Sequence, residues 1–114
     1  MALTGIVLVG FVLVHMAGNL QVLIGREAIN AYAYALQNLP APILWGSRLF
    51  LLACVLVHAV TAYQLIKENR IARPRANEIE VTKRAGWASL RMGLTGSLML
   101  AFIVFHLLHF TIRL

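Results

Sequence analysis

The sequence predicts an all-α membrane protein with three transmembrane helices, and its composition is the first indication. Of 114 residues, 61% are hydrophobic and only 12% are charged, and the mean hydropathy is +0.80, whereas a soluble domain is about a quarter charged. Three apolar runs, near residues 3–24, 45–66 and 87–112, are each long enough to cross ~30 Å of hydrocarbon. We therefore expect a single transmembrane domain over residues 1–114.

Two of these apolar runs carry the same short pattern. The sequence Leu-Thr-Gly begins at Leu3 and again at Leu94, and in both places a phenylalanine follows six residues after the glycine and a histidine four residues after that. His15 and His106 therefore lie equally far along two predicted helices. An ionisable residue inside a membrane helix is a functional hypothesis by default. The matched pair indicates two axial ligands for one metal ion.

The first predicted helix ends near Gly25, because glycine tolerates the left-handed conformation found at helix C-termini. This helix lacks the basic N-terminal segment of a secretory signal peptide. Residues 26–38 are predicted to form a short helix at the membrane interface, where Tyr32 and Tyr34 suit the headgroup zone. We expect the sequence Leu-Pro-Ala-Pro at 39–42 to end this helix.

The connection after the second apolar run is basic. Seven of the ten lysines and arginines lie between residues 67 and 91, mostly in a loop predicted at 67–86. By the positive-inside rule this loop and the N-terminus are cytoplasmic, so the charge indicates topology and not nucleic-acid binding. Trp45 and Trp87 are expected interface anchors. Cys54 is expected to be buried and to act as a packing residue. Because it is the single cysteine, the chain has no disulfide framework.

The depths of the histidines predict two levels of cofactor. At 1.5 Å per residue, His15 and His106 lie roughly 16 Å beyond their Thr-Gly pairs, while His58 lies about 13 Å from the cytoplasmic end of its helix. Haem b in electron-transfer proteins takes two neutral imidazoles on opposite faces of the ring. We expect His15 and His106 to ligate one haem and His58 another. Zinc or di-iron sites would need nearby carboxylates or thiolates, and the acids lie in connections or at helix ends: Glu27, Glu68, Glu78 and Glu80.

Four further residues are candidates for contacts with a haem propionate or a quinone. His109 follows His106 by three residues, too close to serve a separate haem. Arg48 and Arg113 lie near the outer ends of their helices, and Arg91 lies at the inner end of the third. Each arginine also fits ordinary charge at a membrane edge, and any of the histidines could instead hydrogen-bond a neighbouring helix.

Three motifs in this order resemble the dihaem cytochrome b membrane subunit of succinate dehydrogenase and fumarate reductase. They are Thr4-Gly5 leading to His15-Met16-Ala17-Gly18-Asn19, His58-Ala59 ahead of a basic exit ending Ala72-Arg73-Pro74, and Thr95-Gly96 leading to His106-Leu107. The resemblance covers nearly the whole chain.

This resemblance implies a five-helix subunit in the bacterial cytoplasmic membrane that holds two haems b, one above the other. It implies that His15 and His106 ligate the distal haem and that His58 ligates the proximal haem, whose second histidine comes from the fourth helix. A flavoprotein and an iron–sulfur subunit would bind the cytoplasmic face and exchange electrons with a quinone, commonly menaquinone. Because the fourth and fifth helices are absent, we expect either a chain incomplete at its C-terminus or a second membrane subunit, with lipid around the bundle.

Other functions stay compatible with the sequence. One is a non-haem membrane anchor or assembly subunit whose histidines only cross-link helices. Another is the cytochrome b subunit of a different respiratory dehydrogenase or hydrogenase, such as a nickel–iron hydrogenase or formate dehydrogenase. A transporter or proton path would call for intramembrane acids or broken helices, and the sequence shows neither. We expect no catalysis by the chain alone.

Overall fold

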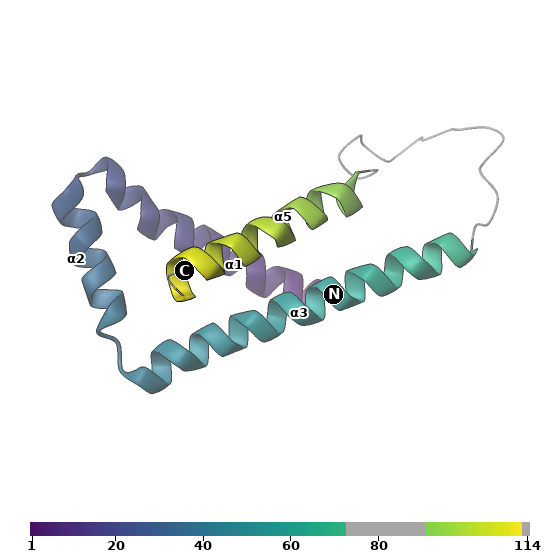
Figure 1. The fold of residues 1–114 in the computed structure, drawn as a ribbon, viewed down its shortest axis with the longest axis horizontal. Helices are drawn as coiled ribbons and strands as arrows, with labels where there is room; N and C mark the ends of the chain where they lie inside the picture. The colour runs from purple at the N-terminus through teal and green to yellow at the C-terminus, as the bar shows by residue number, and fades with distance from the viewer. Residues whose placement is uncertain (73–90, 113–114) are drawn as a thin grey trace. The chain divides into compact units, whose positions relative to one another are not determined.

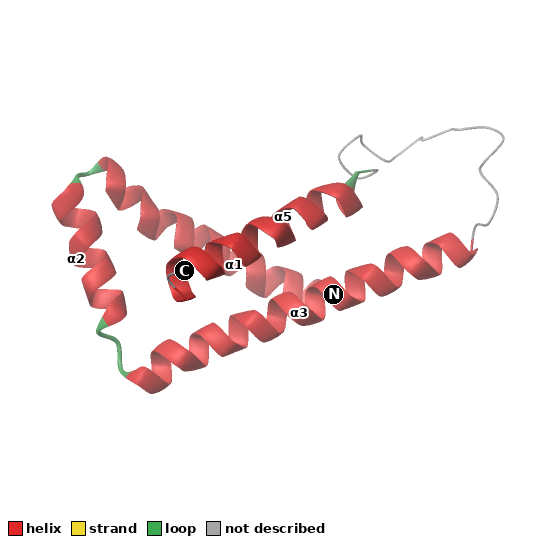
Figure 2. Cartoon of the chain, in the orientation of Figure 1, coloured by secondary structure: helices red, strands yellow, loops and turns green. Residues whose placement is uncertain are grey.

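The computed structural model describes residues 1–72 and 91–112, and these residues are helical almost throughout (Figures 1 and 2). Three helical stretches are long and apolar enough to cross a membrane: Ala2–Leu23, Ala41–Ala72 and Met92–Ile112. This confirms the prediction of an all-α fold with three membrane-length helices and indicates a multi-pass membrane protein. The chain divides into two compact units, Met1–Tyr63 and Gln64–Leu114.

The first unit begins with α1, Ala2–Asn19, whose last turn tightens into the 3₁₀ helix η1, Leu20–Leu23. The Asn19 side-chain amide donates a hydrogen bond to the carbonyl of His15, one turn earlier in the helix, at 2.7 Å. Gly25 then separates the two helices, as the sequence predicts. Its φ of +144° and ψ of +169° lie in an extended region that is essentially restricted to glycine.

The short helix α2, Arg26–Gln37, follows and leads toward the start of α3 (Figure 1). It matches the short helix predicted at 26–38, and its location at the membrane interface stays a prediction. Tyr34 is 72% exposed, whereas Tyr32 is half-buried against α1. A Cβ atom at Gly18 would overlap the phenol of Tyr32, so Gly18 is what allows this ring to lie against α1.

The helix α3, Ala41–Ala72, is longer than its predicted range of 45–66 at both ends. The prolines do not delay the start of the helix until Trp45. Pro42 lies in the first turn, where the backbone N–H that proline lacks would have no partner within the helix. The Pro40 carbonyl accepts hydrogen bonds from the N–H groups of Ile43 at 2.9 Å and Leu44 at 3.1 Å, which starts the helix. At the other end the polar residues after Ile66 continue the same helix.

The second unit contains the end of α3, then α5, Met92–Leu107, and the π-helix η2, Leu108–Ile112. Gly93 lies beside the end of α3, since a Cβ there would be 3.6 Å from Ile66 Cδ1. The third membrane helix was predicted to begin at 87. Residues 73–90 and 113–114 lie outside the described part of the chain, and with them Trp87, Arg113 and most of the basic loop.

The described helices expose most of their apolar side chains. Leu3 is 81% exposed and Leu23 80%, and within residues 1–72 and 91–112 the one buried hydrophobic residue is Cys54, at 8%. The burial of Cys54 is as predicted. Exposed apolar surface on this scale is characteristic of contact with lipid or with partner helices, in agreement with helices of membrane-spanning length.

Candidate functional site

In the first unit, His58 from the middle of α3 meets the first turn of α1. The imidazole Nδ1 lies 3.1 Å from the Thr4 hydroxyl oxygen, across 54 residues of sequence. The same hydroxyl donates to the Met1 carbonyl oxygen at 2.9 Å. Both side chains are half-buried. This polar contact ties one predicted haem ligand to a second membrane helix.

Gly5 provides the space that the His58 imidazole occupies beside α1. A Cβ at Gly5 would lie 3.4 Å from His58 Cε1 and 3.9 Å from Nδ1, so the ring rests against the backbone here. The sequence singled out Thr4 and Gly5 as part of a repeat, without assigning either a contact. Their recurrence as Thr95 and Gly96 was the signal that these positions matter.

The backbone at His58 is also engaged within α3. The Thr61 hydroxyl lies 2.8 Å from the Val57 carbonyl oxygen and 3.0 Å from that of His58. Hydroxyl groups that bond back to the preceding turn in this way often bend a helix locally. The His58 backbone therefore has a fixed polar neighbour on its own helix, and the ring has one on α1.

His15, on α1, stacks against a phenylalanine of its own helix. The rings of Phe11 and His15 have centroids 5.2 Å apart and an interplanar angle of 23°. Residues four apart lie on one face of an α-helix, so the Phe-x-x-x-His spacing itself produces this pair. The His15 side chain is exposed.

His106, in the second unit, repeats this arrangement. Phe102 stacks against it with centroids 5.8 Å apart at 26°, and Phe110 lies on it at 4.9 Å and 41°. His106 is half-buried. The recurring sequence pattern is thus a recurring side-chain pair, one in each unit.

His109 lies in the π-helix η2. Its ring is nearly parallel to that of Phe105, with centroids 5.8 Å apart at 6°, and it meets Phe110 edge-on at 4.8 Å and 85°. Single turns of π-helix inside membrane-length helices are frequently found at functional sites. His109 is exposed, and its stacked partner is a different phenylalanine from those of His106.

Of the arginine candidates, Arg48 lies in the second turn of α3 and Arg91 is the residue before α5. The Arg48 guanidinium lies over the Trp45 ring, 5.2 Å from its centroid, a cation–π arrangement that suits a membrane interface. Arg91 is exposed at the start of α5, and its carbonyl accepts hydrogen bonds from the N–H groups of Leu94 and Thr95. Arg113 lies outside the described residues.

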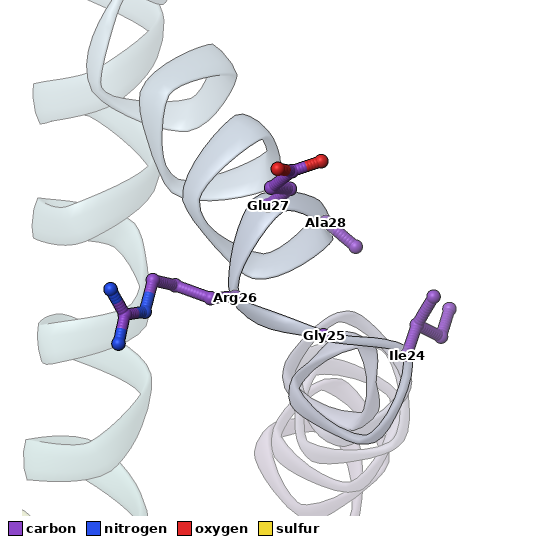
Figure 3. A pocket seen from close by; sticks show the side chains of 5 residues that line it. All are labelled: Ile24, Gly25, Arg26, Glu27 and Ala28. Atoms are coloured by element: carbon purple, nitrogen blue, oxygen red, sulfur yellow. The ribbon is translucent and has the colours of Figure 1, made fainter.

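The turn between α1 and α2 forms a shallow open pocket lined by residues 24–28 (Figure 3). In the figure Ile24 points to one side of the turn and Arg26 to the other. All five lining residues are consecutive, and none was a predicted ligand. The pocket is therefore a feature of the local turn, remote in sequence from the histidines.

The three histidines predicted to bind haem b, His15, His58 and His106, all lie within the described residues. Within residues 1–72 and 91–112, no three His, Cys, Asp or Glu side chains gather as a metal-binding group, and a haem iron needs only two imidazoles. Glu27 and Glu68, the acids within these ranges, lie in the first turn of α2 and near the end of α3. The structure brings Thr4, Gly5 and His58 together and places His15 and His106 in different units.

Comparison with protein-family models, with curated proteins and with solved structures finds no match for this chain.

Proposed function

We propose that this chain is the membrane-anchor cytochrome b subunit of a succinate:quinone oxidoreductase, carrying electrons between an iron–sulfur subunit and a membrane quinone through haem b. The repeat is the observation that supports this most strongly. Leu-Thr-Gly, phenylalanine and histidine recur at identical spacing in two membrane-length helices, and the phenylalanine stacks on the histidine in both. A matched pair of oriented imidazoles suits the two faces of one macrocycle.

In this proposal His15 and His106 would hold the distal haem through their imidazoles, and His58 would supply one imidazole to the proximal haem. The haem contributes one-electron oxidation and reduction. Phe11 and Phe102 limit the rotation of the distal ligands. With two protein ligands each, the haem irons would have no open position for oxygen, and the subunit would transfer electrons without activating oxygen.

The proposed setting is the bacterial cytoplasmic membrane, with the N-terminus in the cytoplasm. The basic segment after the second membrane helix faces a flavoprotein and an iron–sulfur subunit there, and menaquinone is the expected quinone. His109, Arg48, Arg91 and Arg113 are proposed contacts for haem propionates or quinone. Further helices, from additional sequence or a second membrane subunit, complete the bundle and supply the second ligand for the proximal haem.

A second candidate function is a membrane anchor without haem. The hydrogen bond between Thr4 and His58 favours it, because a histidine that only cross-links helices would make such a bond. The two candidates differ in whether the histidines bind haem.

The deciding experiment is a dithionite-reduced minus oxidised spectrum of the complex purified through this chain, with haem counted per chain. We expect a bis-histidine haem b signal, with His106→Ala and His58→Ala each removing a different component. Gln64→Ala, which changes an exposed polar residue of α3, is the control and should leave both components. A folded complex that retains its partners and shows no haem would overturn the cytochrome proposal and support the anchor.

A further inference from the structure

The hydroxyl of Thr4 has one proton and two close partners, and only one placement of that proton satisfies both contacts. The Met1 carbonyl oxygen, 2.9 Å away, can only accept a hydrogen bond. The His58 Nδ1, 3.1 Å away, can donate or accept depending on its tautomer. Both contacts are satisfied together when Thr4 donates to Met1 and accepts from Nδ1–H of His58.

This arrangement selects one tautomer of the neutral imidazole. With the proton on Nδ1, Nε2 of His58 carries the lone pair. A histidine that ligates a metal usually donates its other ring N–H to a fixed acceptor, which orients the ring and raises its basicity as a ligand. Thr4 supplies such an acceptor, and Gly5 keeps the ring against α1, with Cε1 3.4 Å from the position of a Cβ.

We infer that Thr4 is a positioning residue for His58, holding its imidazole in the Nδ1–H tautomer with Nε2 available to the iron of haem b. This inference rests on the proposed function. It also reconciles the interhelical hydrogen bond with haem binding, because the bond uses Nδ1 and the iron uses Nε2. The His58 side chain can then link two helices through Nδ1 and bind iron through Nε2.

Thr95 provides a matched control for Thr4. It occupies the same place in the Leu-Thr-Gly repeat, and its hydroxyl lies 3.2 Å from the Met92 carbonyl and 3.3 Å from that of Arg91. Thr4→Val and Thr95→Val both remove a bond from threonine to the preceding turn. Only Thr4→Val also removes the acceptor for His58, while Thr4→Ser keeps it.

The first measurement is ¹⁵N NMR of the imidazoles in the 114-residue chain, labelled at histidine, in detergent micelles without haem. His58 is assigned by the signal lost in His58→Gln. We expect the Nδ1–H tautomer in the wild type, in Thr4→Ser and in Thr95→Val. We expect a shift toward the Nε2–H tautomer in Thr4→Val. An unchanged tautomer in Thr4→Val would overturn the inference.

The second measurement is made on the complex purified through this chain. Loss of a hydrogen bond behind a metal ligand typically lowers metal-site affinity about 10- to 100-fold. Thr4→Val should therefore deplete the His58-dependent haem component and raise the midpoint potential of what remains, because a less basic imidazole favours the reduced iron. Thr4→Ser and Thr95→Val should keep that component at wild-type content and potential.

The two measurements separate the failure of the inference from the failure of the proposed function. A complex that binds both haems equally well with Thr4→Val, at unchanged potential, overturns the role of Thr4 alone. A complex without haem in the wild type overturns the proposed function, and this role of Thr4 with it, even where Thr4 controls the tautomer of His58.

Discussion

The stacked phenylalanine and histidine are the smallest feature that recurs in this protein. Phe11 with His15 and Phe102 with His106 have centroid separations of 5.2 and 5.8 Å and interplanar angles of 23° and 26°. Each pair comes from one helix, so its geometry depends on the i to i+4 spacing alone. A neighbouring ring narrows the rotation of each imidazole before any cofactor binds.

Replacing that ring should weaken the distal haem site specifically. Aromatic pairs contribute about 0.5–1.5 kcal/mol beyond the area they bury. We therefore expect Phe11→Leu and Phe102→Leu each to lower affinity for the His106-dependent haem roughly 2- to 10-fold. The measurement is haem per chain across a haem titration, resolved by component. Phe50→Leu, an exposed site on α3, is the control, and an equal loss of both haem components would contradict the prediction.

The sequence could identify those site residues whose contacts are local, and it could not identify contacts between residues far apart in the chain. The histidines were visible because ionisable side chains in apolar runs are conspicuous, and their phenylalanine partners lie within one turn. The contact between Thr4 and His58 spans 54 residues, and no local pattern encodes which helices meet. The repeat drew attention to Thr4, but its contact with His58 is known only from the structure.

At the scale of elements, Gly25 determines how the first membrane helix joins α2. Its φ of +144° is a conformation that side chains with a Cβ rarely adopt. We expect Gly25→Ala to lower the free energy of unfolding by about 1–3 kcal/mol, measured by titrating dodecyl sulfate into detergent micelles of the purified chain.

The control for this prediction is Gly46→Ala, inside α3, where a Cβ would meet nothing within 4 Å. Alanine is the better helix former, so this change should raise the free energy of unfolding by up to ~1 kcal/mol. If both substitutions stabilised the chain equally, the turn at Gly25 would not depend on its backbone conformation.

Composition determined the existence of the membrane helices, while local chemistry determined their ends. Long apolar runs predicted three helices, and the structure contains them. The prediction placed the start of the second helix too late, because proline was taken as a breaker where Pro42 in fact occupies the first turn of α3. The π-helix at Leu108–Ile112 had no sequence signal, since its hydrogen-bond register differs from an α-helix without any change in composition.

The length of α3 bears on how the whole chain is oriented in the membrane. Its 32 residues span about 48 Å, against the ~30 Å of a hydrocarbon core. The last turns carry Lys67 and Arg70 and continue the helix past its apolar part. By the positive-inside rule we predict that this end projects into the cytoplasm, where the proposed iron–sulfur subunit would bind.

Cysteine labelling tests this orientation directly. In a Cys54→Ala background, Asn69→Cys places a thiol at the basic end of α3 and Ala35→Cys places one on α2, and both native side chains are exposed. A membrane-impermeant maleimide should label Asn69→Cys in inverted vesicles and Ala35→Cys in right-side-out vesicles. For each variant the extent of labelling should be at least about 10-fold higher than in the opposite preparation, because a charged reagent does not cross hydrocarbon. Labelling with the reverse preference would place the basic segment outside, and no cytoplasmic iron–sulfur subunit could then bind there.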